Sequence, residues 1–433
     1  MNTGKRDLYL DALRASALLV VVFGHWLATL PRMHDGLMVG TEHLLDVWNL
    51  AGLLTWFVQV VPLFVFVSAA VSTEGASRRL HQGDRQLHWW AGRALGLARP
   101  TATYIAAIAA LALFSLYAGG RFVGPLNQSL TVHLWFLIML LTVQALLPAS
   151  VEADRRFGLA AVFGLIIIAL VVDLVRAGLP GPAGLLEMGE RVMANASSPG
   201  AAVGWINAFA VWLLPQQLGI AWKRGRFRGA GMGALLMLIG LAWLGATVAS
   251  GYPTAMVGFD LDGKSNMLPP TLALIGVMWV QVGAVLLFEK PARWLLDREH
   301  ISGAVGLLGA LGMPLYLWHK LAELPAAWLG ERLDLPIDAG VPGSAGFWQG
   351  RLWWIALCIV MVIPVIAAVV GFEMSRRRDV PAATSTAAIL TGGAALFAGL
   401  TVSMLLGAMP GALIGIVLIL AASRLLRDKL RQG

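Results

Sequence analysis

The chain has 433 residues, of which 58% are hydrophobic and 13% charged, and its mean hydropathy of +0.74 indicates a polytopic membrane protein. The polar intervals between its apolar runs are too short to hold a separate soluble domain of ordinary size. The net charge of +8 does not point to nucleic acid, because the basic residues form short clusters between apolar spans and set topology there. The single cysteine, Cys358, excludes an internal disulfide and a thiolate metal cluster.

The first apolar segment carries polar side chains that a helix built only to cross lipid would lack. Arg14 and His25 are eleven residues apart, so on a helix they fall within roughly 20° of one face, about 16 Å apart along the axis. Asp11 lies within roughly 40° of His25 on the same face. Charged residues in mid-span usually face a protein interior or an aqueous cavity, and an imidazole suits proton transfer. We therefore expect a functional stripe, with end anchoring by snorkelling as the alternative for Asp11 and Arg14.

Hydropathy along the whole chain predicts an all-α polytopic membrane helix bundle of about twelve transmembrane helices. Basic residues gather in alternate connections, so the positive-inside rule places both termini in the cytoplasm. The opposite connections hold acidic residues such as Asp35, Glu42, Glu323 and Asp338, and we expect them to face outward. The predicted spans are 10–30, 50–72, 100–119, 131–149, 158–177, 202–222, 230–250, 269–288, 302–320, 351–372, 387–405 and 410–423.

Several short motifs follow one another in a characteristic order along these spans. They are Arg14 and His25 with ten residues between them, Val61-Pro-Leu-Phe-Val-Phe-Val-Ser68, Arg93 and Arg99-Pro100, Leu134-Trp-Phe-Leu137, and Gly312-Met-Pro-Leu-Tyr-Leu-Trp-His319. In this order they resemble the acyltransferase 3 family of integral membrane acyltransferases over about residues 6–378. One departure is Ser68-Ala69, where the family usually has Ser-Gly.

The family resemblance implies ten shared helices, so we expect an integral membrane acyltransferase domain at 1–378. Residues 379–433 would then form an additional transmembrane pair with a basic tail. We expect this pair to serve packing, homo-oligomerisation or contact with an envelope-complex partner. The resemblance also implies a multi-pass protein of the cell membrane, most simply the bacterial cytoplasmic membrane, in contact with membrane lipids.

The reaction implied by the resemblance moves an acyl group, in the first instance acetyl, from cytoplasmic acetyl-CoA or another acyl-CoA. The acceptor would be a hydroxyl of an envelope carbohydrate, glycolipid or lipid. Such a transfer needs a base for the hydroxyl proton, and His25 is the natural one. Arg14 would bind the phosphates of the donor or hold the carboxylate of Asp11.

Two further groups of candidates follow from the same motifs. Arg93 and Arg99, with Arg14, are expected to bind the donor, and their alternative is a role in topology alone. The expected acceptor-binding residues each have a structural alternative: packing for Trp135 and Tyr316, a helix cap for Asn266, and a solvated position at the interface for His319. The histidines are otherwise scattered, so we expect no metal.

Two other classes of function fit the same polar stripe. A proton-coupled transporter or exporter of an envelope precursor would use it to relay protons without acyl transfer. A structural partner in an envelope complex would use it as a polar seam between helices. An acyltransferase differs from both because it releases free coenzyme A when donor and acceptor are supplied.

Overall fold

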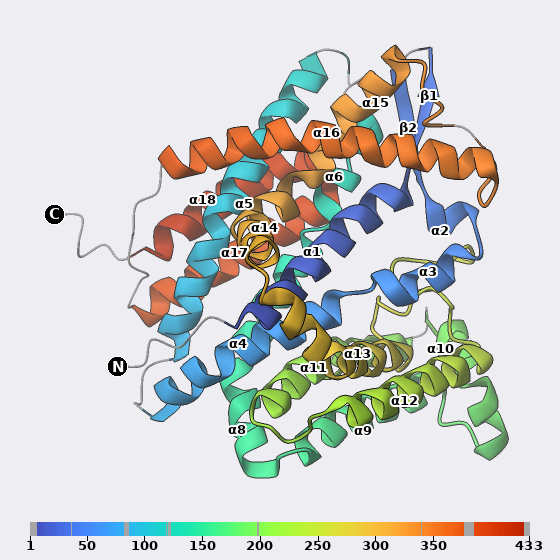
Figure 1. The fold of residues 1–433 in the computed structure, drawn as a ribbon, viewed down its shortest axis with the longest axis vertical. Helices are drawn as coiled ribbons and strands as arrows, with labels where there is room; N and C mark the ends of the chain where they lie inside the picture. The colour runs from blue at the N-terminus through green and yellow to red at the C-terminus, as the bar shows by residue number, and fades with distance from the viewer. Residues whose placement is uncertain are drawn as a thin grey trace. The chain divides into compact units, whose positions relative to one another are not determined.

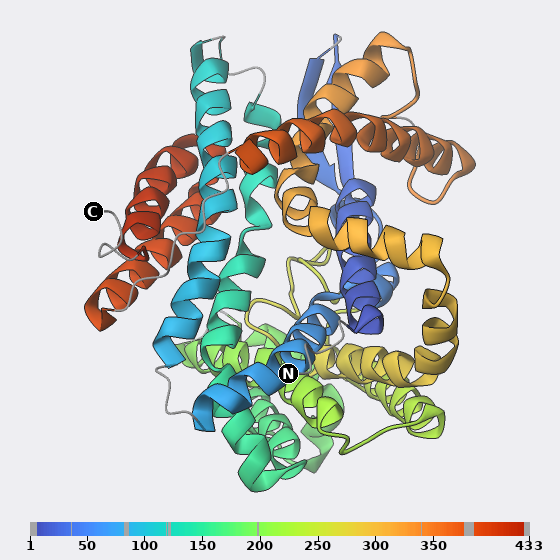
Figure 2. The same ribbon diagram turned by 60° about the vertical axis from the view of Figure 1, so that its left-hand side comes forward.

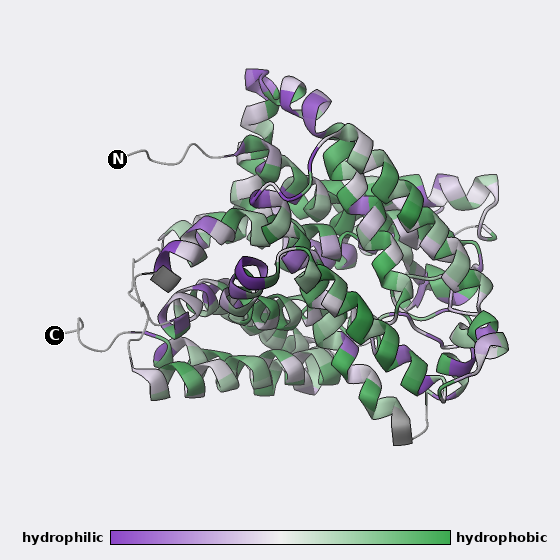
Figure 3. Ribbon diagram, turned by 90° about the horizontal axis from the view of Figure 1, so that it is seen from below, coloured by the Kyte–Doolittle hydropathy of each residue, from purple (hydrophilic) through white to green (hydrophobic). Residues whose placement is uncertain are grey.

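The computed structural model describes residues 7–35, 37–81, 86–117, 119, 123–196, 199–338, 340–375 and 385–427. These residues form helices and one two-stranded hairpin, with a longer non-helical connection at 250–272 (Figure 1). Apolar residues cover most of the length of the long helices, and polar residues gather toward helix ends and connections (Figure 3). Within the described residues, eight helical stretches are long and apolar enough to cross a membrane, or nine when one bent pair is counted as a span. The chain is therefore a multi-pass helical membrane protein.

The elements of the first half of the chain are α1 (Leu8–Ala28), β1 (Thr29–His34), β2 (Leu37–His43), α2 (Leu44–Val47), α3 (Ala51–Val58), α4 (Val61–His81), α5 (Gln86–Tyr117), η1 (Gly124–Leu126), α6 (Ser129–Val132), α7 (Trp135–Ala145), α8 (Leu147–Phe157), α9 (Ala160–Arg176), η2 (Pro182–Glu187), α10 (Met188–Ala194) and η3 (Pro199–Ile206). Those of the second half are α11 (Asn207–Lys223), α12 (Ala230–Ala249), α13 (Ala273–Leu296), α14 (Glu299–Trp318), η4 (His319–Ala322), α15 (Glu323–Arg332), α16 (Ala345–Ser375), α17 (Thr386–Leu406), η5 (Gly407–Gly411) and α18 (Ala412–Leu425).

The number of long spans is smaller than the twelve expected from hydropathy. Helices α9 and α11 have 17 residues each, which makes them about 26 Å long, less than the ~30 Å hydrocarbon core. The predicted spans 387–405 and 410–423 are α17 and α18, which together form one apolar stretch, Thr386–Leu425. The segment predicted at 131–149 bends by 48° between α7 and α8. The expected boundary at residue 378 and both chain ends lie outside the described residues.

The hairpin β1–β2 is a small addition to described residues that otherwise form the expected all-α fold. Its antiparallel strands pair Pro31 with Thr41, and proline is tolerated there because each strand of a two-stranded sheet has a free edge. Arg32 holds the hairpin by donating to Asp338 at 2.6 Å and to Glu42 at 2.5 Å. Hydropathy identified this region only as an acidic connection, since charged residues and a proline do not form the alternating pattern of a strand.

The chain divides into two compact units, of which unit 1 comprises Met1–Val21, Leu45–Arg78 and Leu146–Gly309. Helices α12 and α13 approach closely at glycines: a Cβ added to Gly240 would lie 2.7 Å from the carbonyl oxygen of Gly276. Glycine removes that clash and lets the two backbones come together, as is common in membrane helices.

A buried carboxylate ties other segments of unit 1 together. The Oδ1 atom of Asp173 on α9 accepts from Arg176 at 3.0 Å and from Asn207, the first residue of α11, at 3.1 Å. Its Oδ2 atom accepts from the Tyr252 hydroxyl at 2.9 Å and from the backbone N–H of Leu272 at 3.0 Å. Asp173 therefore fixes the connection that leads into α13 against α9 and α11.

Unit 2 comprises Val22–Leu44, Arg79–Ala145 and Ala310–Gly433. In it the terminal helices α17 and α18 lie alongside α5 (Figures 1 and 2). The rings of Trp90 on α5 and Phe397 on α17 are nearly parallel, 8° apart in orientation, with centroids 6.2 Å apart. A Cβ added to Gly393 would lie 2.8 Å from the Trp90 ring, so the glycine makes room for it. The C-terminal pair is thus packed into unit 2.

Candidate functional site

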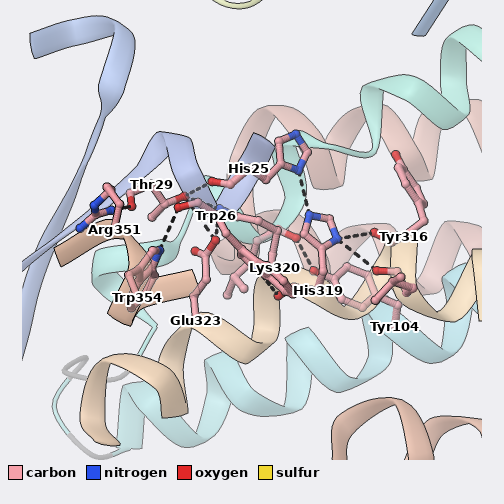
Figure 4. Close-up of polar contacts among 12 residues, drawn as sticks. His25, Trp26, Thr29, Tyr104, Tyr316, His319, Lys320, Glu323, Arg351 and Trp354 are labelled. Atoms are coloured by element: carbon pink, nitrogen blue, oxygen red, sulfur yellow. Dashed lines mark hydrogen bonds and ion pairs between the residues drawn. The ribbon is translucent and has the colours of Figure 1, made fainter. Parts of the chain in front are cut away.

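The centre of unit 2 holds a pair of hydrogen-bonded histidines. His25 lies in the last turn of α1, and His319 is the first residue of η4, directly after α14. The Nδ1 atom of His25 lies 2.8 Å from Nε2 of His319, and the two ring planes differ by 19° (Figure 4). His319 is completely buried, whereas His25 is partly exposed. Among the described residues, the second ring nitrogen of His25, Nε2, makes no hydrogen bond.

Tryptophans hold the main chain on both sides of the pair. The indole N–H of Trp26 donates to the backbone carbonyl of His319 at 3.1 Å, so α1 is joined to η4 next to the two rings. Trp354 on α16 in turn donates to the carbonyl of Trp26 at 2.9 Å. Both indoles are almost entirely buried, which keeps these hydrogen bonds away from water. Three elements distant in sequence therefore fix the position of the histidines.

A buried ion pair begins at the residue directly after His319. Lys320 donates to Glu323 at 2.6 Å and to the Thr29 hydroxyl at 2.8 Å, and all three side chains are shielded from solvent. Thr29 also donates to the carbonyl of His25 at 3.0 Å (Figure 4). Arg351 of α16 donates to the carbonyls of Thr29 at 2.7 Å and Ile337 at 2.5 Å. The cluster joins the end of α1, η4, α15 and α16, with charges that are paired or hydrogen-bonded as burial requires.

Aromatic rings enclose His319 on its other side. His133, between α6 and α7, meets His319 edge to face with centroids 5.5 Å apart, and it meets Tyr104 and Tyr316 in the same manner. The Tyr316 hydroxyl donates to the backbone carbonyl of His133. His133 is buried, yet within the described ranges neither of its ring nitrogens makes a hydrogen bond. Three histidines from three segments thus lie together in one mostly apolar environment.

The structure brings several of the predicted site residues together in unit 2. Tyr316 and His319 are part of the cluster, and Trp135 approaches it through Phe136, whose ring lies 5.3 Å from that of Tyr316. The interfacial, solvated position considered for His319 is wrong, because its side chain is completely buried.

The expected donor-binding arginines of unit 2 both lie on α5. Arg99 precedes Tyr104 of the cluster by five residues, about 8 Å along the helix. Arg93 is more exposed, and its guanidinium lies 5.0 Å from the centre of the Trp89 ring. Helix α5 therefore carries both basic side chains and one wall of the histidine cluster.

The other predicted residues belong to unit 1. Arg14 and Asp11 lie on the first half of α1, where their charged atoms are 3.9 Å apart, as the alternative of a paired carboxylate predicts. Asn266 is completely buried and donates to the carbonyls of Pro253 at 2.6 Å and Ala255 at 2.9 Å. Its amide oxygen accepts from Thr271 at 2.7 Å, so this side chain shapes the connection before α13.

Four polar residues of the cluster were missed by sequence reasoning: His133, Lys320, Glu323 and Arg351. His133 directly precedes the quoted Leu134-Trp135-Phe136 motif. Arg351 is a charge on a helix that is otherwise strongly apolar, and this was a usable signal of function. Glu323 was interpreted only as an acidic residue of an outer connection, because its burial depends on tertiary contacts. No group of three His, Cys, Asp or Glu side chains within the described ranges is placed to hold a metal ion.

Comparison with known proteins identifies the family of the chain. A family model described as an acyltransferase domain, that of acyltransferase 3, matches residues 7–371. No curated protein and no solved structure shows significant similarity to the chain. The match includes both histidines of the pair and ends before α17 and α18.

Proposed function

Because the chain belongs to the acyltransferase 3 family, we propose that it transfers an acyl group, in the first instance acetyl, from acyl-CoA to a hydroxyl of an envelope carbohydrate, glycolipid or lipid. The observation that carries this proposal is the ring of His25. Its Nδ1 atom is hydrogen-bonded to a buried histidine, whereas its Nε2 atom has no partner among the described residues. A fixed imidazole with one unoccupied nitrogen suits general base catalysis.

The proposed transfer involves only His25 and the two substrates, and His25 returns to its neutral form at the end. Nε2 takes the proton of the acceptor hydroxyl while the hydroxyl oxygen forms a bond to the acyl carbon. The carbon–sulfur bond of the thioester then breaks, and the proton passes from His25 to the leaving thiolate, which gives free coenzyme A. The base is regenerated in each cycle, and no metal or redox partner is required.

Donor binding is assigned to arginines, because guanidinium groups match phosphate oxygens in bidentate geometry. Arg93 and Arg99 on α5 are proposed to contact the phosphates of acyl-CoA. Arg14, paired to Asp11 on α1, is proposed separately as a residue for donor binding. Trp135 is the proposed acceptor contact, and its motif supports this role. The Tyr316 hydroxyl and the Asn266 amide are buried and already hydrogen-bonded within the protein, so structural roles are proposed for these two side chains. The cell membrane, in the first instance the bacterial cytoplasmic membrane, is the proposed location.

The experiment that tests this function measures release of coenzyme A thiol from acetyl-CoA by purified protein, with membrane extract as the source of acceptor. We expect release that depends on the extract and falls by about 10²–10⁴-fold in His25→Ala. His300→Ala, a histidine on an exposed surface of α14, is the matched control and should retain the parent rate. A folded protein that binds acetyl-CoA but releases no thiol would contradict the proposal and favour a transporter.

A further inference from the structure

The histidine at the start of η4 has both ring nitrogens occupied. Its Nδ1 atom lies 2.8 Å from the carbonyl oxygen of Tyr316 and 3.2 Å from that of Leu315, and its Nε2 atom lies 2.8 Å from Nδ1 of His25. Carbonyl oxygens only accept hydrogen bonds, so the hydrogen must be on Nδ1 of His319. In the neutral ring the other nitrogen is then an acceptor.

The hydrogen bonds of His319 determine the tautomer of the His25 ring. Because Nε2 of His319 accepts, Nδ1 of His25 must be the donor and carry the hydrogen. The remaining nitrogen of His25, Nε2, is left with a free lone pair. The chain of bonds therefore runs in one direction, from His25 through His319 to the carbonyl of Tyr316 (Figure 4).

We propose that His319 is a positioning residue that fixes the tautomer of His25 and so makes Nε2 of His25 the nitrogen that accepts the acceptor's proton. This inference rests on the proposed function. It replaces the acceptor contact first expected for His319, because a completely buried ring with both nitrogens bonded offers nothing to a substrate.

The surroundings of His319 hold its ring in this orientation. Trp26 binds its backbone carbonyl, and the next residue, Lys320, is held by Thr29 and Glu323. When Nε2 of His25 takes up a proton, the positive ring keeps its Nδ1–H bond to the neutral His319. That bond then becomes charge-assisted and stronger than in the resting state. His319 thus stabilises the charged form of the base without taking the proton itself.

Two substitutions at His319 separate this role from simple packing. The amide oxygen of Gln in His319→Gln can occupy the place of Nε2 and accept from His25, whereas the shorter Asn in His319→Asn reaches only the place of Nδ1. We expect kcat to fall by about 10²-fold in His319→Asn and by less than about tenfold in His319→Gln, with the KM for acetyl-CoA unchanged in both. Equal losses in the two variants, or a change in KM alone, would overturn the proposal.

A spectroscopic measurement distinguishes failure of this inference from failure of the proposed function. Nitrogen-15 NMR of histidine-labelled full-length protein, with His25→Ala for assignment, reports which nitrogen of His25 carries the hydrogen. We expect Nδ1–H in the parent and in His319→Gln, and a mixture of tautomers in His319→Asn. Hydrogen on Nε2 in the parent would refute the inference even if acyl transfer is observed. Absence of acyl transfer with Nδ1–H intact would refute the proposed function alone.

Discussion

Two buried carboxylates, Asp173 in unit 1 and Glu323 in unit 2, are supplied with hydrogen-bond donors to different extents. Asp173 accepts four hydrogen bonds, two on each oxygen, from side chains and backbone of three segments: α9, α11 and the connection before α13. Glu323 accepts from Lys320 on Oε1, which also lies 3.3 Å from the Thr29 hydroxyl, and among the described residues its buried Oε2 atom has no hydrogen-bond partner. The first carboxylate is saturated, and the second is not.

The same difference extends to the neighbours of each carboxylate. Around Asp173 the atoms without partners, Arg176 Nε and Asn207 Oδ1, belong to residues that already bind the carboxylate through another atom. Around His319, both ring nitrogens of His133 and Nε2 of His25 are without partners among the described residues. A polar cluster that only holds a fold is expected to satisfy its groups, whereas one that handles protons or ligands leaves some of them open. The cluster around Asp173 thus fits the first description more closely, and the cluster around His319 fits the second.

The largest effect that would test this comparison is the loss of Asp173. Asp173→Asn leaves the buried guanidinium of Arg176 without a counter-charge, so we expect the free energy of unfolding to fall by about 3–5 kcal/mol. Burial, and then the nearby Asp173 carboxylate, raise the pKa of Tyr252, which keeps its hydroxyl a donor at all ordinary pH values. Unfolding in detergent followed by tryptophan fluorescence measures the change. Asp262→Asn, at an exposed position of the same unit, is the control, and an equally small loss in both variants would contradict a structural role for Asp173.

His133 should behave in the opposite way. His133→Phe removes two buried nitrogens that make no hydrogen bond to the described part of the chain, and it keeps a flat ring between Tyr104, Tyr316 and His319. We expect the free energy of unfolding to be unchanged or up to about 1 kcal/mol higher, since an unsatisfied buried polar group is costly. The same unfolding measurement on Asn207→Leu should show a clear loss instead. A loss of comparable size in His133→Phe would mean that the His133 nitrogens are satisfied in solution, and would remove the contrast between the two units.

The smallest expected effect is at the exposed ion pair of the hairpin. The hydrogen bond from Arg32 lowers the pKa of Glu42 below its usual value of about 4.5, so the pair stabilises the folded state above that pH. This contribution disappears as the pH falls through the lowered pKa, and solvent screening limits it to less than ~1 kcal/mol. The difference in unfolding free energy between the parent and Glu42→Gln should therefore be present at pH 6 and become progressively smaller as the pH is lowered below 4.5. A difference that does not depend on pH would show that Glu42 acts through packing.

Local features of the fold followed directly from the sequence. The first span was expected at 10–30 and is α1, Leu8–Ala28, because a long apolar run of good helix formers determines its own structure. Arg14 and His25 lie on this one helix as expected. The identity of the family also follows from the order of short motifs, and the match over residues 7–371 confirms it.

The remaining features depend on contacts that no local pattern contains. His25 and His319 are 294 positions apart, and helical periodicity can place each on its own element only. Lys320 and Glu323 are buried because they contact Thr29 and neighbouring elements. These contacts cannot be recognised in the sequence, which indicated a solvated end of a span instead. The bend after Ala145 and the short length of α9 are likewise not visible in hydropathy, because hydropathy is an average over many residues.

The distance in sequence between the two histidines also sets the order of events during biosynthesis. At about 5–20 residues per second, a ribosome needs roughly 15–60 s to extend the chain over the 294 positions from His25 to His319. During that interval the first helix is already made, and the imidazole of His25 must be accommodated without its partner. The last two helices, which pack on α5, are translated later still. The pair is therefore one of the late products of membrane insertion, and a chain arrested before η4 cannot assemble it.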